Sequence, residues 1–372
     1  MYFGLLLKEL LSYTKDNNIN FEHFCIIVAE TGESGLFNKI TLKNFGPLGE
    51  VVWQDLGMIN LVIGENGCGK TFILKALYSA IRTLEEYKRG NDKRSESEIL
   101  ADKLYWTFQP DKIGDLVKKG AESALSCTVE INHQTFSYSF GKDTSKKISS
   151  LNNQVPPRSS NSIFIPAKEI LSLHQIILKS RDTDKAFGFD DTCLDLARAL
   201  IQLPSRGKTH TTFAVSHKKL ETLLGGKVEY EKTNNQWQYK KGNQTFPIGV
   251  TAEGIKKIAI LDTLLGNRYL NPQSILFIDE PESSLHPVAI NQLLDIIADL
   301  AQSGIQIFLA SHSYFVVKKL YLIAQKKGMS IPVMKADNNQ WITEDLKDGI
   351  PDNAIIDESI RLYKEEVELV LK

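Results

Sequence analysis

A stretch of eight residues has the composition of a loop that holds phosphate groups. Residues 64–71 read Gly-Glu-Asn-Gly-Cys-Gly-Lys-Thr and fit the pattern G-x-x-x-x-G-K-[ST] between an apolar run and an amphipathic one. Glycines let backbone N–H groups turn toward an anion at a helix N-terminus. Lys70 would stabilise the β- and γ-phosphates of ATP, and the Thr71 hydroxyl would ligate Mg²⁺. The cradle would be formed by Gly64, Glu65, Asn66, Gly67, Cys68, Gly69, Lys70 and Thr71.

Two adjacent carboxylates, Asp279 and Glu280, follow the apolar residues 275–278. Four apolar residues predict a buried strand, and ligands bind at the C-terminal ends of strands in open α/β sheets. Asp279 would hold Mg²⁺ directly or through water, and Glu280 would act as general base toward the attacking water. An Asp-Glu pair can also cap a turn, but its combination with a phosphate loop favours nucleotide hydrolysis.

His312 is the third candidate, because it follows another apolar run, residues 305–310, after a single serine. A lone histidine is more often a satisfied core or surface residue. At the end of a strand beside Asp279 and Glu280, however, an imidazole can hydrogen-bond the γ-phosphate and hold the attacking water. We therefore expect a catalytic role for His312.

Strands and helices are expected to alternate around these motifs. Apolar residues at alternate positions predict strands over 39–45, 50–53 and 128–140. Runs that are apolar, or apolar except for one residue, predict buried strands at 58–63, 162–165, 275–278 and 305–310. Residues 227–246 predict a hairpin, 141–158 a loop, and 87–97 a loop or a helix extension. Helices are predicted over 74–84, most of 168–225, 254–265, 288–301 and 356–367. The class is α/β: a mainly parallel core sheet, an antiparallel β lobe and a helical insertion.

A polar, glycine-containing stretch around residue 33 divides the chain. Residues 1–35 are expected to form an N-terminal appendage, whose first eleven residues favour a surface helix over a signal peptide. Residues 36–372 are expected to form the ATP-binding domain. It would comprise an N-terminal lobe with the phosphate loop (37–165), a helical and hairpin insertion (166–250) and a C-terminal lobe with the other motifs (251–372).

Composition and charge exclude several classes of protein. The 372 residues are 42% hydrophobic and 24% charged, which is ordinary globular composition. The formal net charge of −1 gives no overall attraction to nucleic acid or to anionic membranes. Lysine pairs such as those at 146–147, 218–219, 240–241, 256–257, 318–319 and 326–327 are expected to be solvated, although folding could gather some of them into a stripe that tracks phosphates. Four cysteines without metal-ligand spacing, and no apolar run near ~18 residues, favour a cytoplasmic protein.

The three motifs, in this order, resemble those of ABC-type ATPase heads, and the resemblance extends from about residue 37 to 315. Ser283-Ser284-Leu285-His286 follows the two carboxylates where that family carries its D-loop, so Ser284 resembles the residue that crosses to a partner subunit. The resemblance implies ATP and Mg²⁺ as ligands, hydrolysis to ADP and phosphate, and a head-to-tail dimer or a larger oligomer.

Two further family elements are less complete in this sequence. The family's Leu-Ser-Gly-Gly-Gln signature, which caps the γ-phosphate of the other subunit, corresponds here to residues 250–257. Ala252 stands at the serine position beside Thr251, and Gly254 fits, so the contact between subunits would rest on the helix N-terminus and Lys256. A glutamine near Mg²⁺ is also implied, and Gln109 is the candidate.

Within the ABC type, the chain resembles the soluble branch that includes SMC, OLD and RecF-like heads. About 180 residues separate Thr71 from Thr251 without sustained heptads, so the long coiled-coil arms of SMC heads are not expected. Residues 164–171 and 349–353 resemble stretches of compact ATPases from bacterial anti-phage defence, with Septu-type ATPase subunits as the nearest named group. That resemblance implies a separate protein effector, such as a nuclease.

We therefore expect a defence ATPase that senses a trigger and controls a separate effector. One alternative is a stand-alone DNA repair or recombination ATPase of the RecF-like kind. A scaffold that binds ATP without hydrolysing it is disfavoured by Glu280. Intrinsic nuclease activity is disfavoured because no further acidic cluster suits two-metal chemistry. Binding to nucleic acid stays open.

Overall fold

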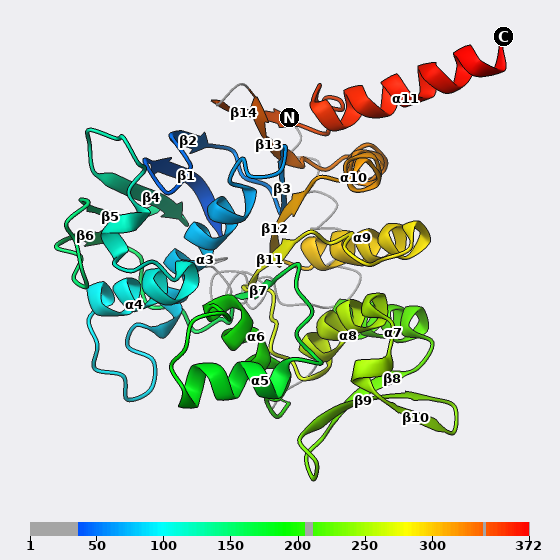
Figure 1. The fold of residues 1–372 in the computed structure, drawn as a ribbon, viewed down its shortest axis with the longest axis horizontal. Coiled ribbons are helices and arrows are strands. Elements are labelled where there is room, and N and C mark those ends of the chain that lie inside the picture. Colours follow the sequence, from blue (N-terminus) through cyan, green and yellow to red (C-terminus); the bar gives the residue numbers. More distant parts are fainter. Residues whose placement is uncertain (1–35, 205–210, 338–339, 372) are drawn as a thin grey trace, which may run out of the picture. The chain divides into compact units, whose positions relative to one another are not determined.

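Four short apolar strands lie side by side and in parallel at the centre of the protein (Figure 1). In spatial order they are β3 (Ile59–Ile63), β12 (Gln306–Ser311), β11 (Ile275–Asp279) and β7 (Ile163–Ile165). Beyond β3 the sheet continues with the parallel β13 (Pro332–Asp337) and the antiparallel β14 (Gln340–Asp345). Every residue of β3, β11 and β12 is buried, as the mainly apolar runs predicted.

The computed structural model describes residues 36–204, 211–337 and 340–371. All of these belong to one unit, Leu36–Lys372. The appendage expected at residues 1–35 lies outside the described residues. In the described part, no helix has both the length and the apolar character needed to cross a membrane.

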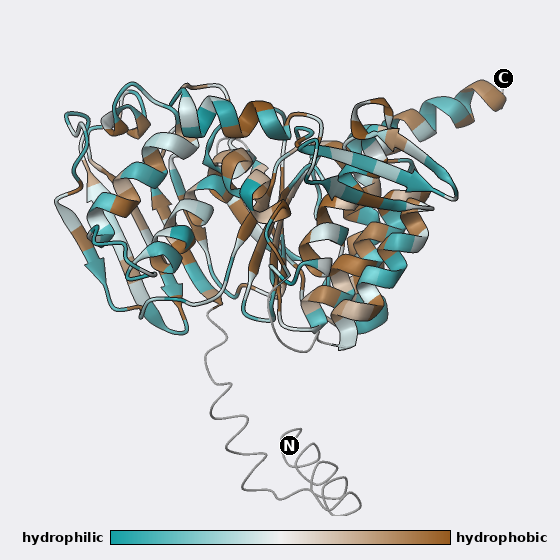
Figure 2. Cartoon of the chain, turned by 90° about the horizontal axis from the view of Figure 1, so that it is seen from below, coloured by the Kyte–Doolittle hydropathy of each residue, from teal (hydrophilic) through white to brown (hydrophobic). Residues whose placement is uncertain are grey.

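Side chains that alternate along the central strands fill two separate cores. Phe277 and Phe308 stack with their ring centroids 5.3 Å apart on one face, and Trp53 packs edge-on against Phe308. Leu276 and Ile307 point to the opposite face. Because each fully buried side chain of this size contributes about 1.5–3 kcal/mol, the two cores fix the sheet firmly between its covering layers. Figure 2 shows the resulting concentration of hydrophobic residues in the central strands.

One face of the sheet is covered by two helices and an antiparallel lobe (Figure 1). The helices are α3 (Lys70–Glu86) and α4 (Glu96–Phe108), and a short 3₁₀ turn, η1 (Ile113–Leu116), follows. The lobe has the order β2 (Glu50–Trp53), β1 (Phe37–Lys43), β4 (Leu125–Ile131), β5 (Gln134–Phe140) and β6 (Ser150–Asn153).

Two predictions for this lobe need correction. Residues 128–140 are not one strand but parts of β4 and β5, because Asn132 and His133 both adopt left-handed backbone angles (φ 50° and 62°) and form a tight hairpin turn. The segment 141–158 contains β6, which pairs with β5. Most of the segment 87–97 is the loop that was predicted, and α4 begins within its last two residues, where Ser95 and Glu98 form a capping box.

Helices cover the other face of the sheet (Figure 1). They are α5 (His174–Leu178), the π-helical turn η2 (Lys179–Thr183), α6 (Asp191–Leu200), α7 (Thr211–Leu224), α8 (Glu253–Gly266), α9 (Pro287–Gln302) and α10 (Tyr314–Lys327). The hairpin predicted at 227–246 is a three-stranded sheet of β8 (Lys227–Glu231), β9 (Gln236–Lys241) and β10 (Gln244–Pro247), followed by η3 (Ile248–Val250). Helix α11 (Ala354–Val370) ends the described chain and buries none of its residues.

Mixed α/β layers around a mainly parallel sheet confirm the predicted fold class. Strand register then decides where the candidate residues lie. Asp279 is opposite Ala310, and Ser311 is opposite Ile63. The C-terminal ends of β3, β12 and β11 are therefore level with one another, and each is followed directly by one of the three motifs.

Candidate functional site

The phosphate-type loop connects the end of β3 to the start of α3. At Gly69 φ is 108°, and a Cβ there would lie 2.6 Å from a methyl carbon of Leu48, so only glycine fits. Gly69 also precedes the first residue of α3 without a side-chain cap, which leaves the first N–H groups of the helix for another acceptor. These features suit an anion at the N-terminus of α3.

Lys70 is the first residue of α3 and only 8% exposed. Its ammonium donates hydrogen bonds to the carbonyl oxygens of Gly64 and Glu65, at 2.8 and 2.9 Å. The charge is therefore held over the loop whose N–H groups would contact a triphosphate. This is the position expected from the sequence pattern.

Thr71 and Asp279 come together although they are far apart in the sequence. The Thr71 hydroxyl donates a hydrogen bond of 2.9 Å to Oδ2 of Asp279. Burial raises the pKa of Asp279, and the Thr71 hydrogen bond opposes that rise. A hydroxyl and a carboxylate oxygen are ligands that Mg²⁺ accepts, usually together with phosphate oxygens and water. The two side chains therefore fit the metal predicted for them.

Glu280 and His312 face each other at the neighbouring strand ends. Nδ1 of His312 lies 3.6 Å from Oε1 of Glu280, and the two side chains are 44% and 35% exposed. Glu280 has a left-handed backbone (φ 49°), a conformation that costs a non-glycine residue on the order of 1–3 kcal/mol. Its N–H is fixed by a 2.9 Å hydrogen bond to the carbonyl oxygen of Ala310. The turn directs the carboxylate toward solvent, where a water molecule could be activated.

Glu282 is a site residue that the sequence reasoning missed. Its Oε1 accepts hydrogen bonds from the Ser311 hydroxyl (2.8 Å) and from the backbone N–H of His312 (3.3 Å). The carboxylate thereby ties the segment after β11 to the segment that carries His312. The sequence does show a third acidic residue close to Asp279 and Glu280, in Asp-Glu-Pro-Glu. Its hydrogen-bond partner Ser311, however, is 29 residues away in the sequence, so its role could not be predicted from spacing.

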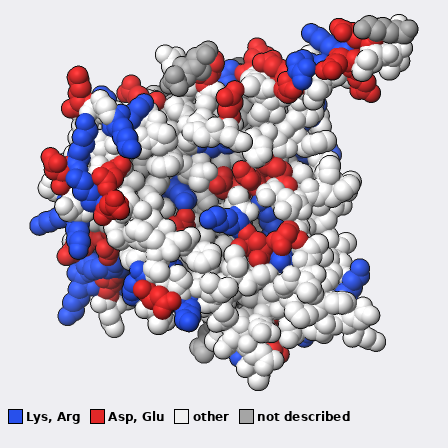
Figure 3. All heavy atoms as spheres, in the orientation of Figure 1, with Lys and Arg blue, Asp and Glu red and all other residues white. Residues whose placement is uncertain are grey.

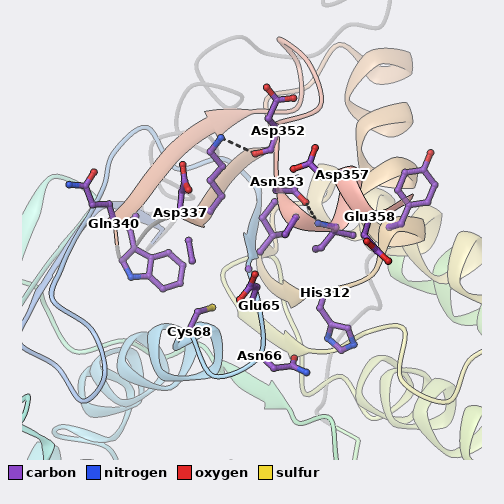
Figure 4. A pocket seen from close by; sticks show the side chains of 18 of the residues that line it. Glu65, Asn66, Cys68, His312, Asp337, Gln340, Asp352, Asn353, Asp357 and Glu358 are labelled. Carbon is purple, nitrogen blue, oxygen red and sulfur yellow. Dashed lines mark hydrogen bonds between the residues drawn. The ribbon is translucent and has the colours of Figure 1, made fainter. Parts of the chain in front are cut away.

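A cavity of about 1540 Å³ opens beside the phosphate-type loop (Figure 4). Gly64, Glu65, Asn66, Cys68 and His312 line one side. The opposite wall comes from β13, β14 and the start of α11, with Lys335, Trp341, Asp352, Asn353 and Glu358 among its residues. The Lys335 ammonium donates to the Asp352 carbonyl at 3.0 Å and joins two parts of this wall. The volume is ample for a nucleotide, and this wall was not foreseen from the sequence.

The signature-like residues lie on a different surface. Ala252 is the exposed N-cap of α8 and provides no capping side chain. A Cβ on Gly254 would lie 2.9 Å from the carbonyl oxygen of Ser284, so α8 and the D-loop-like segment touch through their backbones. Ser284 is exposed and has φ 63°. None of the three is among the residues found to line the large cavity. Their proposed contact with a nucleotide in another subunit stays a prediction.

Lys256 was expected to contribute to the contact between subunits, and its position in the single chain contradicts this. Its side chain is only 3% exposed, and its ammonium lies 2.7 Å from Oε1 of Glu253. A buried cation needs a nearby counter-charge, and Glu253 supplies one within the same helix turn. Lys256 therefore does not extend from α8 toward a second subunit.

Gln109 is engaged away from the other predicted metal ligands. Its amide nitrogen donates to the carbonyl oxygen of Phe189 at 2.9 Å, and its amide oxygen accepts from the N–H of Gly188 at 3.0 Å. Both polar atoms thus hold the segment before α6. A role for Gln109 at Mg²⁺ would require these bonds to break, and it stays a prediction.

On the face shown in Figure 3, acidic and basic side chains are intermixed over most of the surface, and Lys and Arg are most frequent along the left edge. In five of the seven adjacent lysine pairs, at least one ammonium is bound by a carboxylate or a carbonyl group. These ammonium groups belong to Lys219, Lys240, Lys256, Lys257, Lys319 and Lys327. Local neutralisation of this kind weakens the attraction of a phosphate backbone.

Comparisons with known proteins agree with this architecture. Residues 59–318 match the family described as "AAA domain, putative AbiEii toxin, Type IV TA system". One similar solved structure is the Smc head bound to the C-winged helix domain of ScpA. The match covers 84% of this chain and 98% of the Smc head chain, with a TM-score of 0.51 and 13% sequence identity.

A second structure is the Smc head domain with an extended coiled coil bound to the C-terminal domain of ScpA, from Pyrococcus furiosus. This match covers 88% of the present chain and 98% of the Smc chain, with a TM-score of 0.51 and 12% sequence identity. No curated protein matches the sequence. At such low identity the structural likeness establishes the P-loop NTPase fold alone.

Proposed function

This chain belongs to the family described as AAA domain, putative AbiEii toxin, type IV toxin–antitoxin system, and from that premise we propose that it hydrolyses ATP to ADP and phosphate. The observation that carries the proposal is the meeting of three strand ends. There Thr71 lies 2.9 Å from Asp279, and His312 lies 3.6 Å from Glu280. A site that only binds nucleotide has no need of the second pair.

The residues would act in a defined order. Lys70 and the N–H groups at the start of α3 bind and orient the triphosphate. Thr71 and Asp279 would hold Mg²⁺, which when bound offsets charge on the β- and γ-phosphates. Glu280 accepts a proton from the attacking water as the new bond to the γ-phosphorus forms and the bond to the leaving oxygen breaks. His312 holds that water and the γ-phosphate from the other side.

We propose that a second copy completes the site. The N-terminus of α8 has no side-chain cap, and Ala252 and Glu253 are exposed there, so the free N–H groups of this first turn can be offered to the γ-phosphate of another subunit. Ser284 adjoins the same surface. A symmetric head-to-tail dimer would place this surface of each copy over the phosphate loop of the other.

The test is phosphate release by the full chain and by Glu280→Gln, with Glu122→Gln in the exposed loop before β4 as the matched control. We expect steady turnover for the wild type and the control, and a loss of at least about 100-fold for Glu280→Gln with ATP binding retained. Light scattering of Glu280→Gln with ATP should give the mass of a dimer or larger oligomer. If the wild type and Glu280→Gln release phosphate equally slowly, the hydrolytic function is refuted.

At a finer level, we propose a sensor that controls a separate effector in bacterial defence. The family description, with its toxin and toxin–antitoxin terms, and the stretches 164–171 and 349–353 support this. A protein encoded beside this chain should co-purify with it, and ATP or Glu280→Gln should change the yield of that complex. Turnover stimulated by DNA in the absence of any partner would instead favour the RecF-like alternative.

A further inference from the structure

Lys257 lies on α8, one turn after the surface proposed to meet a second subunit, but it points inward. Its ammonium donates a hydrogen bond to the backbone carbonyl oxygen of Glu280. The neighbouring Lys256 is paired with Glu253, whereas no described carboxylate lies within ion-pair distance of Lys257. A half-buried ammonium is therefore used to bind the main chain of the proposed general base.

The bond is made at a strained point of the backbone. Glu280 has φ 49°, and its carbonyl oxygen also accepts a hydrogen bond of 3.0 Å from the N–H of Ser283. Two donors on one carbonyl fix the orientation of the peptide that follows Glu280. Since the left-handed conformation is unfavourable for glutamate, these contacts help to hold it and so to aim its side chain.

The surroundings of the ammonium make its inward position informative. Burial lowers the pKa of Lys257 to about 8, even though Glu282, Glu280 and Asp279 act in the opposite direction. Solvation alone would draw a lysine side chain outward from a helix. The lysine instead lies beside the segment after β11, among three of the carboxylates that organise the candidate site.

Helix α8 connects this contact to the proposed subunit interface. Gly254, three residues before Lys257, packs against the carbonyl of Ser284. Three residues span about 4.5 Å along a helix, so a displacement of the first turn of α8 would be transmitted directly to Lys257. Helix α8 would therefore contact the nucleotide bound by the other subunit with its first turn, and the general base Glu280 of its own subunit through Lys257.

We propose that Lys257 is a positioning residue that keeps Glu280 aimed at the attacking water and couples that orientation to the seating of α8. The proposal rests on the ATP hydrolysis proposed above. A purely structural lysine, retained as a counter-charge for nearby carboxylates, would affect stability but would not act through Glu280.

The experiment measures kcat, KM and ATP affinity for Lys257→Met and Lys257→Arg. We expect Lys257→Met to lower kcat at least tenfold, with KM and ATP affinity changed less than twofold. Lys257→Arg keeps a cationic donor and should recover kcat to within about threefold of the wild type. Lys319→Met is the matched control and should leave kcat unchanged, because Lys319 on α10 is paired with Asp295 on α9, away from the candidate site.

A double variant separates positioning from structure. If Lys257 acts through the Glu280 carboxylate, Lys257→Met should have less than a twofold effect on single-turnover hydrolysis in the Glu280→Gln background. An equal loss in both backgrounds, an unchanged kcat in Lys257→Met, or an inactive Lys257→Arg that folds normally by thermal unfolding would overturn the proposal. A wild type as inert as Glu280→Gln would instead overturn the hydrolytic function, and this proposal with it. If Lys257→Met does not fold, the Arg variant and Lys257→Gln decide the question.

Discussion

The phosphate-loop surface and the α8 surface differ in how fully one chain builds them. At the loop, Lys70 is buried and bonded to two carbonyl oxygens, and Thr71 is bonded to Asp279. At the N-terminus of α8, Ala252 is exposed and offers no cap, and the Thr251 hydroxyl turns back to the carbonyl oxygen of Pro247 at 3.3 Å. The first surface is organised by its own contacts, whereas the second presents backbone groups outward.

This difference implies a division of labour. Affinity for ATP should depend on the phosphate-loop surface alone, because its groups converge within one chain. Turnover should depend on both surfaces, because the second surface would reach the γ-phosphate only from another copy. Changes at the two surfaces should therefore have different effects on binding and on catalysis.

The largest effect is expected for Lys70→Ala. Loss of a hydrogen bond from a charged donor contributes about 1.5–3 kcal/mol, so ATP affinity should fall by roughly 10- to 100-fold or more, and turnover should become undetectable. Binding can be followed with a fluorescent ATP analogue. Lys232→Ala, in the exposed turn between β8 and β9, is the control and should bind normally. Tight ATP binding by Lys70→Ala would remove the phosphate loop from the site.

Removal of Mg²⁺ should stop turnover without unfolding the chain. Thr71 and Asp279 contact each other directly, so the fold does not need a metal to keep them together. Excess chelator should reduce phosphate release at least about 100-fold, and added Mg²⁺ should restore it. The melting temperature of the protein without nucleotide should be the same with and without chelator. A chelator-resistant rate would contradict the metal assignment.

A smaller and more selective effect is expected at the α8 surface. Gly254→Ala would place a Cβ 2.9 Å from the Ser284 carbonyl oxygen and force α8 away from that segment. We expect turnover to fall about tenfold while ATP affinity changes less than twofold, since the phosphate loop is untouched. An equal loss of affinity and turnover would mean that the two surfaces are not separable.

The smallest effect lies at the other end of α8. Burial raises the pKa of Asp262 to about 6, and its Oδ1 lies 3.4 Å from Nε2 of His217. Because the folded-state pKa is above the ordinary value, the folded protein binds the extra proton between about pH 4 and 6, and this group destabilises the fold above that range.

Asp262→Asn should therefore raise the free energy of unfolding at pH 8 by on the order of 1–3 kcal/mol, and by only about a third as much near pH 4.5. Urea unfolding at both pH values measures this, and turnover should stay within twofold. A destabilised variant at pH 8 would mean that the ionised carboxylate is favourable.

Much of the fold and of the candidate site follows from local sequence. The loop at residues 64–71, the pair Asp279 and Glu280, and His312 each directly follow an apolar strand, and a parallel sheet brings such strand ends together. The spacing within each motif is short, so residue types alone predict its chemistry. Their roles in catalysis stay predictions until they are tested by substitution.

Only the tertiary structure decided which distant groups support those motifs. The two adjacent lysines on α8 look equivalent in the sequence, yet Lys256 is paired with Glu253 and Lys257 binds the backbone of Glu280. Similarly, Glu282 accepts a hydrogen bond from the Ser311 hydroxyl, and β13, β14 and the start of α11 form a wall of the cavity. These contacts depend on how helices rotate and pack against the sheet, which is set by many weak interactions along the whole chain and not by the spacing of a few residues.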